Sequence, residues 1–164
     1  MARTTFRRLT RSDEPFLWTA LYHAIHVAPG EDAPPPGVVR RPDLARYVAG
    51  WTERPGDLGL LACDDGRRIG AAWLRQWLAG DHGYGFVGET TPELSMALLP
   101  GHRGRGVGTR LLRHLLSVAA EQFDAVSLSV SETNPARRLY EREGFVPAGH
   151  PAGGSTTMVK RLAR

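Results

Sequence analysis

The 164-residue chain contains a single cysteine, Cys63, and a single lysine, Lys160. One cysteine forms neither an intramolecular disulfide nor a cysteine-based zinc cluster, which excludes both kinds of cross-link. Long apolar runs are also missing, and this excludes a membrane-spanning helix of about 20 residues. The segment from Met1 to Arg11 lacks the apolar stretch of a signal peptide, so we expect a cytoplasmic protein.

The rest of the composition is typical of a globular domain. Hydrophobic residues make up 41% and charged residues 23% of the chain. We therefore expect residues 1–164 to form a single domain that buries a core without disulfides. All but one of the 21 basic residues are arginines, and the formal net charge is +4. This excess reflects either codon usage or phosphate binding by guanidinium groups, and the positions of the arginines decide between the two.

Hydrophobic periodicity and turn residues predict strands and helices in alternation, with no internal repeat. Strands are predicted at residues 4–9, 58–63, 69–77, 93–99 and 125–130, and closing strands at 145–148 and 156–162 around a turn at 149–155. Helices are predicted at residues 12–28, 42–51, 107–119 and 134–143. The strand–helix–strand order across residues 93–130 implies a right-handed parallel crossover within a mixed α/β sheet.

The most informative segment, Pro100–Arg110, lies between a predicted strand and a predicted helix. Three glycines, at 104, 106 and 108, let backbone amides approach a ligand. The free N–H groups and the positive dipole end of the next helix face the same place, and arginines at 103, 105 and 110 add charge. The segment therefore predicts a site for phosphate or pyrophosphate. It lacks the lysine of a nucleotide triphosphatase loop and the glycine spacing of a dinucleotide-binding fold.

Two motifs in this half of the chain resemble those of the GCN5-related N-acetyltransferase (GNAT) superfamily. The first, Gln/Arg-x-x-Gly-x-Gly/Ala, is matched by Arg103, Gly106 and Gly108. The second is an asparagine followed by a helix that carries Leu-Tyr and ends in Gly-Phe, matched by Asn134, Leu139, Tyr140, Gly144 and Phe145. The resemblance covers the C-terminal half well and the first 90 residues only through their element order. It implies a GNAT-like acyl-CoA N-acyltransferase fold, with a central mixed sheet that splays between its fourth and fifth strands and about four flanking helices.

The resemblance also implies that residues 1–92 border the acceptor and residues 93–164 bind acetyl-CoA. The pantetheine arm would pair with the fourth strand at Ala97, Leu98 and Leu99, where a strand N–H also faces the developing oxyanion. The pyrophosphate would lie on the loop residues Arg103, Gly104, Arg105, Gly106, Val107, Gly108 and Thr109. Asn134 would cap the following helix, bind the cofactor, or do both. Arg137, on that helix, is a further phosphate candidate.

Acyl transfer to an amine needs a base and an acid. The resemblance assigns the acid to Tyr140, which would protonate the departing thiolate; the alternative is core packing beside Leu139. It assigns the base to Glu93, at the start of the fourth strand; the alternatives are a solvated carboxylate there and Glu89 as the base. No metal is expected, because the histidine pair at positions 23 and 26 has no evident third ligand.

These residues predict an N-acetyltransferase that moves the acetyl group of acetyl-CoA to a primary amine of a small molecule or peptide, by direct attack in a ternary complex. The first alternative is a non-catalytic acyl-CoA-binding sensor. The second, a nucleic-acid-binding module, is disfavoured because the basic residues are interleaved with acidic ones and no reading helix is evident. We expect neither nucleic acid nor a membrane as partner, and a homodimer stays open. No motif identifies the acceptor.

Overall fold

The computed structural model describes residues 3–149 and 153–163. Within them, one seven-stranded sheet has the order β1-β2-β3-β4-β5-β7-β6. The strands are β1 (Thr4–Arg8), β2 (Leu58–Asp64), β3 (Arg67–Arg75), β4 (Glu93–Leu98), β5 (Ala125–Ser131), β6 (Val146–Pro147) and β7 (Ser155–Arg161). β4 and β5 are parallel and the other neighbours are antiparallel. The predicted turn at 149–155 includes residues 150–152, which lie outside the described residues.

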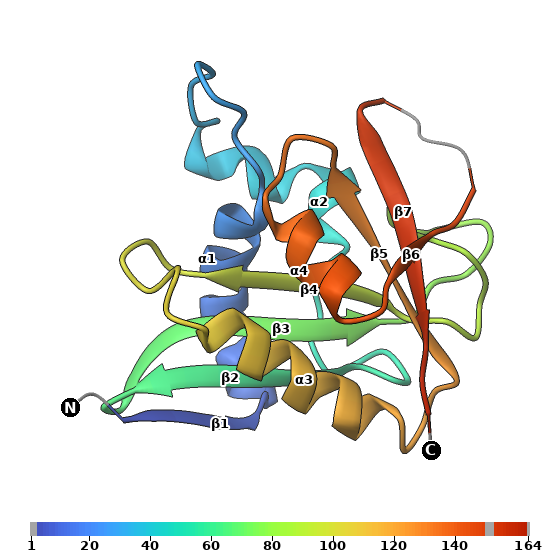
Figure 1. Ribbon diagram of the computed structural model, residues 1–164, viewed down its shortest axis with the longest axis horizontal. Helices are drawn as coiled ribbons and strands as arrows, with labels where there is room; N and C mark the ends of the chain where they lie inside the picture. The colour runs from blue at the N-terminus through green and yellow to red at the C-terminus, as the bar shows by residue number, and fades with distance from the viewer. Residues whose placement is uncertain (1–2, 150–152, 164) are drawn as a thin grey trace.

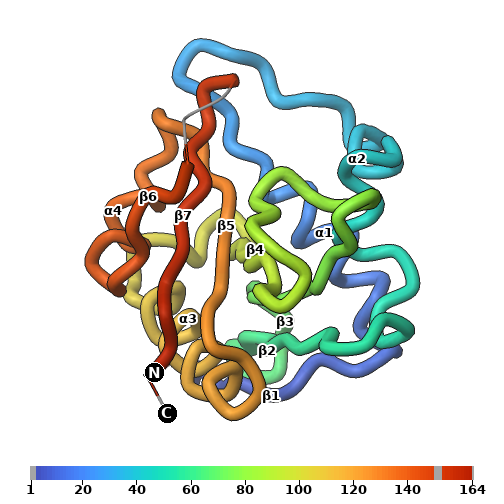
Figure 2. The backbone as a smooth tube through the Cα atoms, turned by 90° about the vertical axis from the view of Figure 1, so that its right-hand side faces the viewer, coloured from blue at the N-terminus to red at the C-terminus, as the bar shows by residue number. Residues whose placement is uncertain are grey.

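Helices cover both faces of the sheet (Figures 1 and 2). α1 (Glu14–Ala24) and α2 (Pro42–Ala45) lie on one face, and α3 (Val107–Ala119) and α4 (Ala136–Arg142) lie on the other. Two short 3-10 helices, η1 (Arg11–Asp13) and η2 (Pro36–Arg40), precede α1 and α2. This arrangement confirms the predicted mixed α/β fold and the parallel crossover through α3. In the portion of the chain that is described, no helix has the length and apolar character that a membrane span requires.

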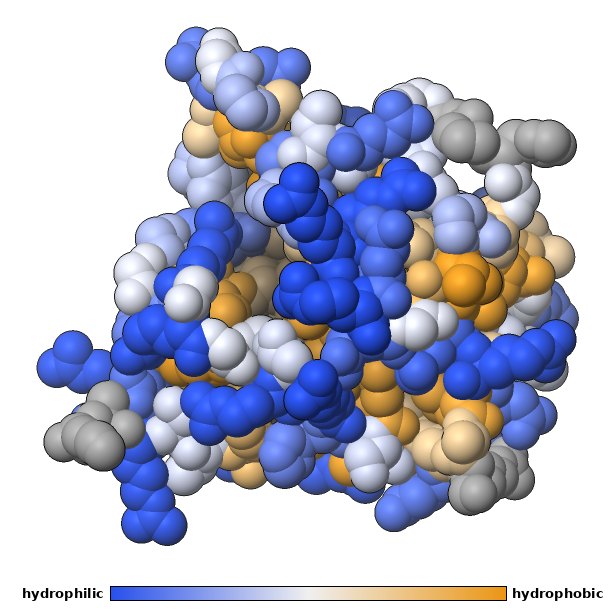
Figure 3. Space-filling model, viewed as in Figure 1, coloured by the Kyte–Doolittle hydropathy of each residue, from blue (hydrophilic) through white to orange (hydrophobic). Residues whose placement is uncertain are grey.

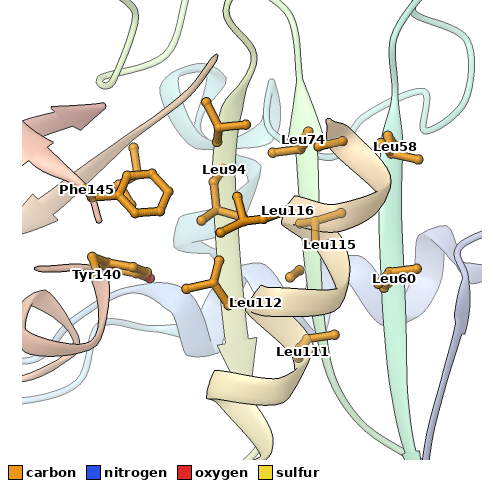
Figure 4. Close-up of a cluster of buried hydrophobic side chains, with 14 of the residues drawn as sticks. Leu58, Leu60, Leu74, Leu94, Leu111, Leu112, Leu115, Leu116, Tyr140 and Phe145 are labelled. Carbon is orange, nitrogen blue, oxygen red and sulfur yellow. The ribbon is translucent and has the colours of Figure 1, made fainter. Parts of the chain in front are cut away.

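Each face of the sheet buries its own hydrophobic cluster. On one face, leucines that repeat at helical spacing on α3 point onto β2, β3 and β4 (Figure 4); they are Leu111, Leu112, Leu115 and Leu116, packed over Leu58, Leu60, Leu74 and Leu94. On the other face, α1 packs Leu17, Ala20 and Leu21 against a cluster that includes Trp51, Trp73 and Trp77. Each buried leucine stabilises the fold by roughly 1.5–3 kcal/mol. These two layers hold β2, β3 and β4 as one rigid unit.

β4 and β5 meet only near one end. Among the described residues their ladder has a single register pair, Glu93 with Ser127, beside which the Ser127 amide donates to the Pro92 carbonyl at 2.9 Å. β4 continues to pair with β3 as far as Leu98, and β5 pairs with β7 as far as Ser131. The two strands therefore diverge, as Figure 1 shows, and the predicted V-shaped gap is confirmed. Backbone groups along the facing edges lack strand partners.

The first helix is shorter than the sequence predicts. α1 ends at Ala24 and not at residue 28, because Ile25 takes an extended conformation with φ −71° and ψ 118°. Ile25 and Val27 are β-branched, and such residues favour extended backbone. At the other end, the Asp13 carboxylate organises the helix entrance, where it accepts the Thr10 amide at 2.8 Å. The chain thus leaves α1 early and runs along the open side of the gap.

The second helix is also shorter, with only Pro42–Ala45 of the predicted 42–51 in α-helix. The buried guanidinium of Arg75 explains this difference. It donates to the carbonyls of Arg46, Ala49 and Gly50 at 2.9, 2.7 and 3.2 Å, and it pairs with the buried Asp57 carboxylate at 2.9 Å. Since these carbonyls are satisfied by a side chain, the segment folds into turns around Arg75 and does not continue as a helix.

Replacing Asp57 by alanine should lower the free energy of unfolding by about 3–5 kcal/mol, because the Arg75 charge would stay buried without its carboxylate. Denaturant unfolding followed by tryptophan fluorescence measures this loss. The matched control is Arg11→Ala, which removes the ion pair of Arg11 with Glu53 at 3.8 Å, with the two side chains 80% and 65% exposed. This control should leave the stability unchanged. An Asp57→Ala loss below about 1 kcal/mol would show that the three carbonyls alone satisfy Arg75.

Candidate active site

A cavity of about 1170 Å³ occupies the gap between β4 and β5. Its walls come from these two strands, the end of α1 and the segment after it, the β4–α3 loop and α4. Figure 3 shows the surface hollowed between this loop and α4, with apolar residues at the bottom of the hollow. Seven of the residues singled out in the sequence line the cavity, namely Glu93, Ala97, Leu98, Arg103, Gly104, Asn134 and Tyr140.

Glu93, the first residue of β4, is 3% exposed and has three hydrogen-bond donors. Its Oε2 accepts the Tyr47 hydroxyl at 2.7 Å, and its Oε1 accepts Trp77 Nε1 at 2.9 Å and the Gly85 amide at 3.0 Å. Burial raises the pKa of Glu93 to about 7, against the lowering effect of the three donors. The alternative of a solvated carboxylate is therefore excluded. At neutral pH the group is poised to exchange a proton.

Tyr140 combines core packing with a hydroxyl at the cavity. Its ring lies edge-on to Phe145, with centroids 5.8 Å apart, and it belongs to the same hydrophobic cluster as the α3 leucines (Figure 4). Its hydroxyl makes no hydrogen bond with the residues that the structure describes. Burial raises the pKa of Tyr140 to about 12, so the phenol keeps its proton at neutral pH. The side chain can donate that proton to a group in the cavity.

The β4–α3 loop presents backbone and not side chains to the gap. Gly104 and Gly106 have φ values of +77° and +78°, and a Cβ built on either glycine would meet no atom within 4 Å. The Arg110 amide bonds to the Gly106 carbonyl at 3.2 Å as α3 begins, so amides 107–109 have no partner within the helix. Free amides at the positive end of a helix dipole are the groups that bind anions in other helices.

The arginines of the site are engaged with protein groups. Arg103 donates to the carbonyls of Leu98 and His23, each at 3.3 Å, and so joins the loop to the end of α1. Arg105 pairs with Asp64 at 3.4 Å, and Arg137 bonds the Thr156 hydroxyl at 3.2 Å. The remaining candidates from the sequence lie outside the cavity lining, namely Leu99, Arg105, Gly106, Val107, Gly108, Thr109 and Arg137. The groups at this loop that are free to bind an anion are therefore mainly backbone amides.

Asn134 precedes α4 and caps it. Its Oδ1 accepts the Ala136 amide at 2.9 Å, while the residue also lines the cavity. Both roles considered from the sequence are thus geometrically compatible. Glu89, the substitute base, lies outside the lining, and its carboxylate accepts the Ala79 amide at 2.8 Å. The structure therefore places Glu93, and not Glu89, where an acceptor would enter.

The two histidines of the α1 region line the cavity without forming a metal site. His26 Nε2 lies 2.9 Å from the Thr133 hydroxyl, and this contact bridges the segment after α1 to the β5–α4 loop. Burial, aided by the charge of Arg103, lowers the pKa of His23. Within residues 3–149 and 153–163, no three His, Cys, Asp or Glu side chains are grouped to hold a metal ion.

Sequence reasoning missed two partners of the candidate base. It placed Tyr47 in a helix and Trp77 at the end of a strand, yet both donate to Glu93. The signal that could have found them is chemical, because a buried tyrosine or tryptophan needs an acceptor for its polar hydrogen. The residues lie 46 and 16 positions before Glu93, however, so the sequence alone does not pair them.

Residues 18–145 match the sequence profile of the acetyltransferase (GNAT) family. The chain belongs to the GNAT family. A stretch of 67 residues is 46% identical to N-alpha-acetyltransferase 40 of Saccharomyces cerevisiae, a match that covers 35% of this chain and 24% of the yeast protein. The chain thus aligns with only about a quarter of the length of that relative.

Solved GNAT structures share the fold over nearly the whole chain. The ribosomal-protein-alanine N-acetyltransferase of Brucella melitensis is 21% identical, with a TM-score of 0.68, over 96% of this chain and 99% of that one. A GNAT superfamily phosphinothricin acetyltransferase from Sinorhizobium meliloti, solved in complex with AcCoA, is 20% identical, with a TM-score of 0.69, over 97% and 88% of the two chains. At these identities the similarity establishes the fold.

The raised pKa of Glu93 predicts a pH-dependent stability that Glu93→Gln should lack. The folded protein holds this proton up to about pH 7, while the ordinary value is 4.5. The proton's contribution to stability is therefore fully present below pH 4.5 and lost as the pH rises through 7. We expect the free energy of unfolding of the parent, relative to Glu93→Gln, to fall by about 3 kcal/mol between pH 4 and pH 8. Denaturant titrations across that range test this, and a pH-independent difference would contradict it.

Proposed function

We propose that this GNAT protein transfers the acetyl group of acetyl-CoA to a primary amine of a small molecule or peptide, by direct attack in a ternary complex. The observation that carries the proposal is that one cavity, at the open edge of β4, is lined by both Glu93 and Tyr140. A base and an acid are the two groups that acyl transfer to an amine requires. Family membership and the AcCoA complex of a structural neighbour support acetyl-CoA as the donor.

The β4 side of the cavity fits acetyl-CoA. The open faces of Gly104 and Gly106, with the free amides 107–109, suit a pyrophosphate. The edge of β4 beyond Glu93 is not paired with β5, so an extended amide chain can bond to it at Ala97–Leu99 like an additional strand. In this proposal residues 93–164 hold acetyl-CoA, which supplies an activated thioester carbonyl, and residues 1–92 border the acceptor.

The side chains manage the protons of the reaction. Ionised Glu93 takes one proton from the acceptor ammonium, which frees the nitrogen lone pair. As the nitrogen–carbon bond forms and the carbon–sulfur bond breaks, Tyr140 gives its proton to the sulfur. The second amine proton then restores the tyrosine through solvent, and Glu93 releases its own proton. The products are an amide, a thiol and one proton. Because Glu93 must be ionised, the rate should rise with pH through about 7.

A broad acceptor screen tests the proposed function. Thiol release from acetyl-CoA would be followed with polyamines, amino acids, aminoglycosides and peptides with free N-termini, and the acetylated product identified by mass spectrometry. Acceptor-dependent thiol release with a matching product supports the enzyme. Tight binding of acetyl-CoA without turnover across all these amine classes would instead support an acyl-CoA-binding sensor.

Gly106→Val should abolish CoA binding, because the new side chain would fill the space where backbone meets phosphate. The matched control is Gly66→Val in the β2–β3 turn. Gly66 has a similar φ of +81° and similarly open space around its Cβ position, but it lies in a strand–strand turn, whereas Gly106 is the N-cap of α3. Both variants carry the same backbone strain, so a difference between them isolates the ligand contact. Isothermal calorimetry with CoA decides the matter, and unchanged affinity in Gly106→Val would refute this placement.

Tyr140→Phe should slow turnover by roughly 10²–10⁴-fold while CoA affinity and folding survive, because the ring contact with Phe145 is kept and only the acid is lost. Turnover should persist, since a thiol with a reference pKa of about 8.5 leaves tolerably without an acid. Tyr140→Ala, which also removes the ring, should be less stable. Steady-state rates of the three proteins with one good amine provide the test. A Phe variant within about twofold of the parent, with chemistry rate-limiting, would remove Tyr140 from the mechanism.

A further inference from the structure

The two oxygens of the Glu93 carboxylate have different surroundings. Trp77 Nε1 and the Gly85 amide both donate to Oε1, and neither residue lines the cavity. Tyr47 donates to Oε2 at 2.7 Å and does line the cavity, as Glu93 does. Tyr47 is therefore the partner of the carboxylate on the side where an acceptor amine would arrive.

The direction of the Tyr47 hydroxyl is determined by its other contacts. The oxygen accepts the Tyr84 amide at 2.8 Å, so its one hydrogen is directed to Glu93. The ring packs edge-on against Trp77, with centroids 5.2 Å apart, and the Tyr47 carbonyl accepts Trp73 Nε1 at 2.9 Å. Ring, backbone and hydroxyl are thus each held by a separate contact.

The loop that follows β3 closes tightly over this pair. A Cβ on Gly83 would lie 2.6 Å from Glu93 Oε1 and would also collide with the Tyr47 hydroxyl. A Cβ on Gly85 would lie 2.9 Å from Glu93 Cδ and 2.8 Å from the Leu128 carbonyl carbon on β5. Glycine at both positions lets the loop backbone approach the carboxylate and the Tyr47 hydroxyl, so the loop holds the pair in place.

We propose that Tyr47 is a positioning residue for acetyl transfer, which holds Glu93 Oε2 at the cavity wall in the ionised state that accepts the amine proton. The proposal rests on the proposed function, in which Glu93 is the base. A donor that faces an ionised oxygen stabilises the charged form. Loss of the hydroxyl would leave Oε2 without that donor and shift the carboxyl toward its neutral form, which takes no proton.

Several other polar and charged groups lie near Glu93, but none of those described below donates a hydrogen bond to its Oε2. The charge of His82, in the same loop, also lowers the pKa of Glu93. Arg75 is the register partner of Glu93 on β3, but its guanidinium is bonded to Asp57 and to three carbonyls. The neighbour on β5, Ser127, is not ionisable. Among the titratable side chains around Glu93, Tyr47 is thus the one hydrogen-bonded to its Oε2.

The test compares the parent, Tyr47→Phe, Glu93→Gln and the double variant. Carbon-13 NMR follows the titration of the Glu93 carboxyl, assigned by its absence in Glu93→Gln, and the pH profile of kcat/KM is recorded with one good amine. In Tyr47→Phe the midpoint of the carboxyl titration and the midpoint of the kcat/KM profile should each rise by about one pH unit. The rate at pH 7 should fall by up to about tenfold and recover at higher pH. In the Glu93→Gln background, adding Tyr47→Phe should not change the pH profile of kcat/KM any further.

A second variant keeps the test informative if Tyr47→Phe folds poorly. Incorporation of 3-fluorotyrosine at position 47 keeps the shape of the ring and makes the phenol a stronger donor, so both midpoints should move down. Calorimetry with CoA serves as the fold control and should be unchanged in every variant, because Tyr47 lies away from the β4–α3 loop.

The two possible failures are distinguishable. An unmoved carboxyl titration in Tyr47→Phe and in the fluorotyrosine protein would overturn the positioning role of Tyr47 and leave the base role of Glu93 intact. A carboxyl titration that moves while the rate profile stays in place would overturn the base role of Glu93, and with it the positioning role of Tyr47, while acetyl transfer itself would stand.

Discussion

The parallel pairing of β4 with β5 ends at Glu93 and Ser127, and the divergence of the strands beyond this pair creates the cavity. The divergence leaves backbone N–H and C=O groups without sheet partners, which is costly unless water or a ligand bonds them. Each half of the sheet is held independently. β4 is packed between the helices on its two faces and paired with β3, while β5 is paired with β7. The rigid halves keep the edge of β4 open.

The carboxylate sits at the vertex of this gap, where the two strands still touch. Because the elements converge there, the segment after α2, the end of β3 and the loop before β4 all reach Glu93. A buried carboxylate without donors would be strongly disfavoured, and three donors offset part of its desolvation. The neighbouring buried pair of Arg75 and Asp57 organises the turns that carry Tyr47. The cavity and the proposed base thus arise from the same point of the sheet.

Local patterns in the sequence predict most of the fold. The leucine spacing of α3, the glycines of the β4–α3 loop and the order of strands and helices each depend on neighbours within a few residues. The shortening of α2 was not predictable in this way, because Arg75 captures the carbonyls of a segment about 25 residues earlier. The network around Glu93 was missed for the same reason. The Arg103 side chain likewise donates to a carbonyl of α1 that lies 80 positions earlier in the chain.

Amide hydrogen exchange, measured by NMR with and without saturating acetyl-CoA, tests the central claim most directly, because it reports where the open edge of β4 is filled. The account predicts new protection of alternate amides in β4 beyond Glu93 and of amides 107–109 at the start of α3, with little change in β2. A second cavity, of about 550 Å³, lies between the end of α3 and β7 and is lined by Leu116, Ser117, Ala120, Glu121, Lys160, Arg161, Leu162 and Ala163. Protection confined to that cavity, or none in β4 despite saturation, would contradict the account.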